Sequence, residues 1–171
     1  MAKYYSTKTY GNDRGLSCCF RQWRSKHSHC SLVHGYSIGI RLIFESETLD
    51  EKNWVMDFGG LKAFKEWAEY MFDHTWLVAQ DDPAFQTIML LDKDVYDDGI
   101  ADIRLVPAVG CEKFAELAYS EMDTILQCFK SGKPYDLNGV EYKARYPVGQ
   151  GVKLKSAEVF EHAGNSAIYE G

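Results

Sequence analysis

No apolar run in the chain approaches the about 20 residues that a membrane-spanning helix needs. Residues 1–5 also lack the apolar segment with which a secretory signal peptide begins. The sequence contains no internal repeat and no low-complexity tract. These absences predict a cytoplasmic protein that does not contact a membrane.

The chain has no excess of positive charge. Its formal net charge is −6, whereas a nucleic-acid surface needs clustered lysine and arginine. One short basic cluster, Arg21, Arg24 and Lys26, is an exception. This cluster is either a solvated face or a contact for an anionic small molecule, and charge alone favours the solvated face. We therefore expect no nucleic-acid partner.

The cysteines lack the even number and regular spacing of a disulfide framework. In a reducing compartment such residues are core thiols. The five are Cys18, Cys19, Cys30, Cys111 and Cys128.

The chain is long enough for one domain with a hydrophobic core, because it has 171 residues and 46% of them are hydrophobic.

Periodic patterns of apolar residues predict where the helices and strands lie. Apolar residues at helical spacing predict helices over 60–72 and 111–130, and a helix start near Pro83. Period-two alternation predicts a strand whose even-numbered positions face inward over 31–45, and another that slips near Ser156, as at a β-bulge. The predicted strands are 15–24, 31–45, 103–106, 152–161 and 165–170.

The main elements follow the order strand, strand, helix, helix, strand, strand. That order predicts an α+β domain, an antiparallel sheet with two helices on one face. We expect it to span residues 1–171, with long connections at about 81–103 and 131–150. A four-stranded sheet has exposed edges, which favour oligomers that pair through them.

Three short segments carry a resemblance to a known family. Residues 30–36 form Cys-x3-His-Gly-x on a predicted strand, residues 57–62 form Asp-Phe-x-x-Leu-Lys before a helix, and residues 73–77 form Asp-His-x-x-Leu. In this order they resemble the 6-pyruvoyltetrahydropterin synthase and 6-carboxytetrahydropterin synthase family. Residues 112–115 and 159–162 are similar to the start of its second helix and to its acidic strand end.

The resemblance implies the tunnelling fold (T-fold), a ββααββ unit. Family members assemble into hexamers of two trimers, and each trimer closes a twelve-stranded barrel with active sites at subunit interfaces. The implied activity is that of a lyase on 7,8-dihydroneopterin triphosphate or a related dihydropterin. The implied pathway is queuosine-type deazapurine, tetrahydrobiopterin or folate biosynthesis.

Four functional residues of the family have matches here. The resemblance implies that Cys30, Asp73 and His74 transfer protons and that Glu161 anchors the pterin ring. A carboxylate suits a pterin, because the 2-amino group and a ring N–H form an edge with two donors. If Asp73 orients His74, the pair is an acid–base relay. Taken singly, these residues have plainer interpretations as a surface pair, a core thiol and a solvated carboxylate.

The family's zinc, held by three histidines, is a candidate cofactor with an incomplete ligand set. Of its ligands His34 remains as the metal residue, whereas Phe20 and Tyr36 occupy the other two positions. One histidine cannot hold a tetrahedral zinc, so help would have to come from His27, from His29 or from Cys30. Otherwise the two aromatic residues fill the vacated space.

Three hypotheses remain open. The first is an enzyme like 6-carboxytetrahydropterin synthase that cleaves a dihydropterin triphosphate. The second is an enzyme of altered chemistry, such as an aldolase acting on dihydroneopterin or on a purine-like substrate, with Tyr36 as the acid. The third is a non-catalytic pterin- or purine-binding protein.

Overall fold

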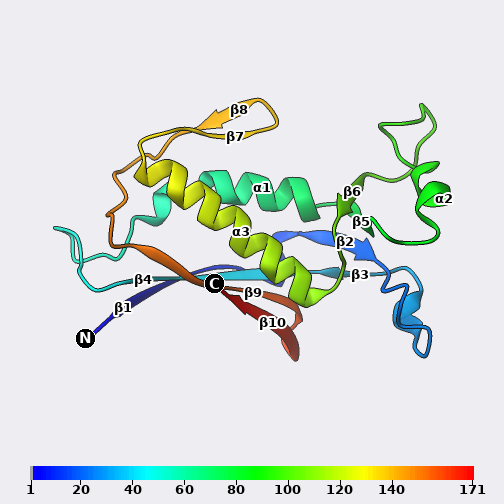
Figure 1. The fold of residues 1–171 in the computed structure, drawn as a ribbon, viewed down its shortest axis with the longest axis horizontal. Coiled ribbons are helices and arrows are strands. Elements are labelled where there is room, and N and C mark those ends of the chain that lie inside the picture. The colour runs from blue at the N-terminus through cyan, green and yellow to red at the C-terminus, as the bar shows by residue number, and fades with distance from the viewer. Residues whose placement is uncertain (1) are drawn as a thin grey trace.

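Two four-stranded sheets and two long helices build the fold, in a computed structural model that describes residues 2–171 (Figure 1). In the first sheet every neighbouring pair of strands is antiparallel. Its strands, in spatial order, are β1 (Tyr4–Tyr10), β4 (Gly39–Ser46), β9 (Lys153–His162) and β10 (Asn165–Glu170).

The second sheet mixes the two pairings. Its strands, in spatial order, are β3 (His34–Ser37), β2 (Ser17–Phe20), β5 (Thr75–Ala79) and β6 (Ile103–Val106). β2 pairs with β3 antiparallel, whereas β2 with β5 and β5 with β6 are parallel. The expected α+β class is thus confirmed. The strand predicted at 15–24 lies in this second sheet, however, and β1 takes the place expected for it in the antiparallel sheet.

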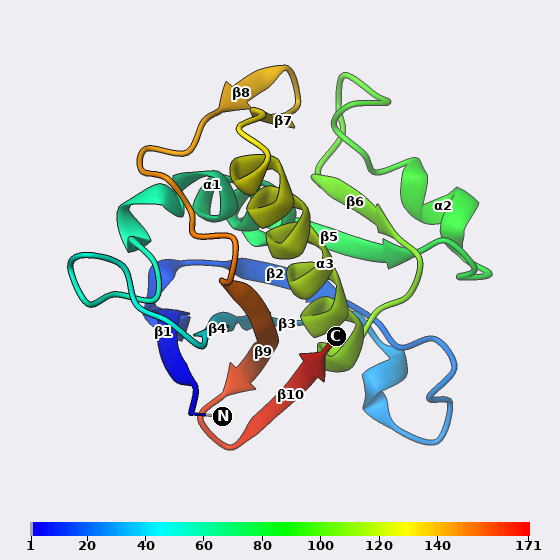
Figure 2. The ribbon, with the colours of Figure 1, turned by 60° about the vertical axis from the view of Figure 1, so that its left-hand side comes forward.

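The helices α1 (Lys62–Phe72) and α3 (Cys111–Lys130) lie on the same face of the first sheet (Figures 1 and 2). α3 packs along β9 and β10. The side chains that α3 buries recur every three or four residues, as in an amphipathic helix. They are Phe114, Ala115, Ala118, Met122, Ile125, Leu126 and Phe129.

Both long connections contain short elements of their own. The segment 81–103 holds α2 (Phe85–Met89), and the segment 131–150 holds a hairpin of β7 (Tyr135–Leu137) and β8 (Val140–Tyr142). Figure 1 shows these insertions at opposite ends of the molecule. Among residues 2–171, no helix combines the length and apolar character needed to cross a membrane.

The predicted strand boundaries need correction. The strand expected at 15–24 is the four-residue β2, and the strand expected at 31–45 is divided into β3 and β4 around Ile38. Inward-facing even positions hold from Ile38 to Phe44, but Leu32 is 65% exposed. The slip near Ser156 is confirmed, because the pairing of β4 with β9 shifts between Ile43 and Phe44.

Candidate functional site

A groove of about 730 Å³ opens where β2 and β3 meet the start of α3 and the turn between β9 and β10. Cys30, His34 and Glu161, three of the residues predicted from the sequence, line it together with Tyr36. We call it the Glu161 groove. Its other lining residues are Phe20, Gln22, Ser25, Val109, Gly110, Cys111, Glu112, Gly164, Asn165 and Ser166.

Glu161 lies in a β-bulge. Asn165 pairs with His162 and Ser166 with Phe160, so Glu161 has no partner residue on β10. A bulge redirects a side chain out of the regular alternation of a strand. The side-chain amide of Asn12 fixes this end of β9, since it donates to the carbonyl oxygens of Phe160 at 3.3 Å and Glu161 at 3.5 Å.

Cys30 sits in a short 3₁₀ turn, η2 (His29–Ser31), and is exposed. The hydroxyl of Ser28 caps this turn by accepting from the backbone N–H of Cys30 at 3.0 Å. The carbonyl of Cys30 accepts from the backbone N–H of Gln22 at 2.8 Å. Backbone bonds on both sides therefore hold an accessible thiol at the rim of the groove.

The first turn of α3 brings backbone N–H groups to the same groove. Gly110 has φ of 125°, a conformation that favours glycine, and its carbonyl accepts the first helical bond from Phe114. The amide groups before Phe114 lie at the positive end of the helix dipole. Burial, and then the charge of Glu161, raises the pKa of Cys111 to about 11. Cys111 is therefore a neutral thiol beside the carboxylate.

An aromatic cluster occupies the positions of the two missing histidines. The ring of Phe20 lies 4.8 Å from the ring of His34 and 6.1 Å from that of Tyr36. Phe20 is 3% exposed and also packs edge-on against Phe114. Burial first, and then the charge of Glu161, raise the pKa of Tyr36. Its phenol thus stays protonated and can donate to a ligand.

The position between His34 and Tyr36 requires a glycine, Gly35. A Cβ atom at residue 35 would lie 2.7 Å from the carbonyl oxygen of Cys18, closer than real Cβ contacts allow. Only glycine lets β3 approach β2 at this point. The alternation of the strand then places the side chains of residues 34 and 36 on the same face.

The side chains around His34 do not fit a zinc bound by three histidines. Nδ1 of His34 lies 2.8 Å from the carbonyl oxygen of Leu32, and its ring contacts Phe20 and Tyr36. Within residues 2–171, no three histidine, cysteine or acidic side chains are grouped to hold a metal ion.

We predict that the purified protein contains well below one zinc ion per chain, because two of the three expected nitrogen ligands are carbon rings. Elemental analysis of protein prepared without chelator measures this directly. One zinc per chain, lost on substitution of His34 by alanine, would contradict the prediction.

Asp73 and His74 form a pair away from this groove. Nδ1 of His74 lies 2.5 Å from a carboxylate oxygen of Asp73, so the hydrogen bond that an acid–base relay requires is present. His74 follows the end of α1 with φ of 56°, and its backbone N–H donates to Ser17 at 2.7 Å. This conformation is uncommon for a residue other than glycine, and the residues that adopt it cluster at functional sites.

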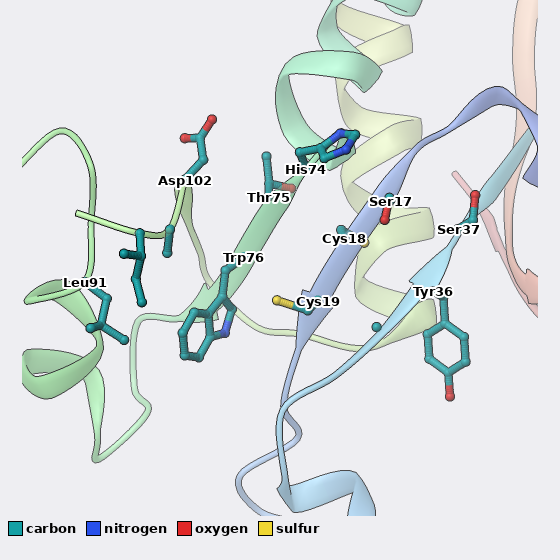
Figure 3. Close-up of a pocket in the computed structure, with 13 residues that line it drawn as sticks. Ser17, Cys18, Cys19, Tyr36, Ser37, His74, Thr75, Trp76, Leu91 and Asp102 are labelled. Carbon is teal, nitrogen blue, oxygen red and sulfur yellow. The ribbon is translucent and has the colours of Figure 1, made fainter. Parts of the chain in front are cut away.

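His74 instead lines a second groove of about 550 Å³, the His74 groove (Figure 3). Cys19, Trp76 and Asp102 also line it. In Figure 3 the ring of Tyr36 points away from His74. The side chain of His74 is 86% exposed. One chain therefore brings Cys30, His34 and Glu161 together and leaves Asp73 and His74 apart from them.

The basic cluster noted in the sequence is largely neutralised within the chain. The guanidinium of Arg21 donates two bonds of 2.8 Å to Asp82, and this contact holds the pKa of Asp82 below its usual range. Arg24 pairs with Asp81 at 2.6 Å and stacks on Trp23. These pairs tie the chain after β2 to the segment before α2.

Sequence patterns missed the residues that only long-range contact brings to the Glu161 groove. Asn12 is 149 positions from Glu161, and Asn165 and Ser166 lie on a predicted strand with no chemical signature. No local spacing marks any of these as groove residues.

A profile of the family described as 6-pyruvoyl tetrahydropterin synthase matches residues 12–171. An uncharacterized protein from Wolinella succinogenes is 18% identical with a TM-score of 0.73, covering 100% of this chain and 99% of that one. The 6-pyruvoyl tetrahydropterin synthase of Plasmodium vivax is 12% identical with a TM-score of 0.59, covering 100% and 99%. That of Caenorhabditis elegans is 14% identical with a TM-score of 0.53, covering 99% and 95%. No curated protein sequence matches the chain.

Proposed function

The chain belongs to the 6-pyruvoyl tetrahydropterin synthase family, and from this premise we propose that it is a cytoplasmic, lyase-like enzyme acting on a 7,8-dihydropterin. Dihydroneopterin triphosphate is the first substrate to test, with a 6-carboxytetrahydropterin synthase-like reaction. The observation that carries the proposal is the meeting of Cys30, Tyr36 and Glu161 with the start of α3 in one groove.

The groove offers partners for the edge of a pterin ring. The carboxylate of Glu161 would accept from the 2-amino group and the adjacent ring N–H, a two-point contact that is strong and selective. The free amides in the first turn of α3 are donors suited to the ring carbonyl oxygen. Cys30, at the rim, would then exchange a proton with the carbon side chain of the pterin.

We propose that the active site is completed by a second copy. Asp73 and His74 form a hydrogen-bonded relay, but His74 faces solvent and lines a different groove from Glu161. The first sheet ends in two unpaired edges, β1 and β10, and exposed edges favour pairing between chains. A homo-hexamer with shared sites, as the family resemblance implies, would bring the two halves together.

The proposal is tested by incubating the protein with dihydroneopterin triphosphate and separating the pterins by chromatography. We expect conversion that is lost in Cys30→Ala. The assay is run with and without added zinc, so that the result does not depend on the metal. Absence of turnover under both conditions, in protein that is folded by circular dichroism, would refute the enzymatic proposal.

Tyr36 favours an enzyme of altered chemistry as a second candidate. Its phenol is held protonated beside Cys30 and Glu161, where it can serve as an acid to a substrate oxygen. Tyr36→Phe keeps the ring contacts with Phe20 and His34 and removes only the hydroxyl.

We predict that Tyr36→Phe lowers kcat by about 10²-fold, the lower range for a positioned acid, with little change in KM. Steady-state kinetics on dihydroneopterin and on its triphosphate measure the effect and show which substrate depends on the phenol. Unchanged kinetics on both substrates would exclude the role.

A further inference from the structure

A third groove, of about 300 Å³, lies between the end of β1 and the outer side of α1. Lys8, Arg14 and Lys65 contribute three positive charges to its lining, against the single carboxylate of Glu69. We call it the cationic groove. The contrast with the Glu161 groove is sharp, since the carboxylates there are Glu112 and Glu161 and no lysine or arginine is among its described lining residues.

Two of the three cations are available to a ligand. Lys65 pairs with Glu69 at 2.9 Å. Within residues 2–171, neither Lys8 nor Arg14 forms an ion pair with a carboxylate; Lys8 instead stands 5.5 Å from the centre of the Tyr10 ring. Arg14 is exposed at the end of the 3₁₀ turn η1 (Asn12–Arg14). In a chain of net charge −6, such unpaired cations in one groove form a distinct positively charged surface that can bind anions.

Tyr10 closes the floor of the cationic groove. Its side chain is 8% exposed, and burial raises its pKa even though the charge of Arg14 acts in the opposite direction. The phenol therefore stays protonated and close to Arg14. A hydroxyl donor beside a guanidinium and an ammonium is the set of groups that phosphate oxygens accept from.

Strand register relates the cationic groove to the Glu161 groove of another copy. Tyr10 pairs with Ile40, Gly39 pairs with Phe160, and Asn165 pairs with His162. The end of β1 and the start of β10 therefore lie at the same end of the sheet, on its two opposite edges.

If β10 of one copy continues antiparallel into β1 of the next, Tyr10 of that next copy lies beside Asn165, which lines the Glu161 groove. The same copy also brings His74 to this junction. The backbone N–H of His74 donates to the carbonyl oxygen of Ser17, and Ser17 directly follows Leu16, which lines the cationic groove.

We propose that the cationic groove of the neighbouring copy binds the phosphate groups of the substrate whose pterin ring lies in the Glu161 groove. This inference rests on the proposed function. It assigns the phosphate contacts to Lys8 and Arg14, not to Arg21 and Arg24, which Asp82 and Asp81 already hold.

Calorimetric binding of neopterin and neopterin triphosphate, oxidised probes that are not turned over, tests the assignment. The test variant is Lys8→Gln/Arg14→Gln. Its matched control is Lys133→Gln/Lys143→Gln, which removes two charges from exposed lysines that do not line the groove. One hydrogen bond to a charged group strengthens binding by about tenfold in affinity. We therefore expect the wild type and the control to bind the triphosphate at least about tenfold more tightly than neopterin.

In the test variant this preference should fall to about twofold or less, with neopterin affinity unchanged. No preference in the wild type, or a preference that survives in the test variant, would overturn the inference. If neopterin binds to none of the proteins, the proposed function is wrong, and inorganic tripolyphosphate tests the groove alone. Tripolyphosphate binding that weakens about tenfold in the test variant supports the groove; equal binding by test variant and control overturns it.

Discussion

His74→Ala is expected to lower kcat/KM for the dihydropterin substrate by about 10²–10⁴-fold, the usual contribution of a positioned acid or base. The imidazole is oriented by the 2.5 Å bond to Asp73, and its exposure within one chain leaves it free to face a substrate held by a second copy. The measurement is steady-state kinetics with the mass of the oligomer checked in parallel. His27→Ala, another exposed histidine that lines neither groove, is the matched control.

The same substitution should leave the equilibrium binding of neopterin within about twofold of the wild type, since the ring is held by a different part of the site. Asp73→Asn should reproduce most of the kinetic loss, because it weakens the bond that orients the imidazole. If His74→Ala keeps full activity, or if it abolishes neopterin binding while the oligomer stays intact, the proposed role is wrong.

Glu161→Gln is expected to weaken neopterin binding by about 100-fold, or about 3 kcal/mol. The glutamine has nearly the same shape, but its amide nitrogen would turn a donor toward a donor of the pterin and its oxygen carries no charge. The β-bulge holds this side chain without a cross-strand partner on β10, so the fold should tolerate the change. Calorimetry measures the affinity, and the thermal midpoint without ligand checks stability.

Glu141→Gln on the exposed strand β8 is the control for the loss of one negative charge. It should bind neopterin like the wild type. A Glu161→Gln variant that binds neopterin with unchanged affinity would show that the pterin edge is recognised elsewhere, and the Glu161 groove would lose its assignment.

Local periodicity was enough to predict the elements that bury a regular face. α3 spans the predicted residues 111–130, and its buried side chains follow helical spacing. The inward positions of β4 followed from strict alternation over 38–44. β1 was missed because two of its inward positions hold the polar residues Ser6 and Lys8, so apolar and polar residues do not alternate along it. β5 was missed because only Asp73 and His74 separate it from α1, so its buried residues directly continue the apolar residues of the helix.

The residue types of the site could be predicted from the sequence, but their grouping could not. Cys30, Asp73, His74 and Glu161 were found by their motifs, yet nothing local indicates that His74 faces a different groove from Glu161. The bulge at Glu161 and its contact with Asn12 depend on pairing between distant strands. The single-domain span, the zinc and the roles of the site residues stay predictions.

The most direct test of the shared site is recovery of activity from two inactive variants. Glu161→Gln and His74→Ala are mixed under conditions that let subunits exchange, and turnover is compared with each variant alone. Random assembly from equal amounts should restore about one quarter of wild-type activity, because half of the Glu161 grooves and half of the neighbouring His74 residues are intact. Activity no higher than that of the parents, in mixtures shown to contain both chains in one oligomer, would contradict a site built from two copies.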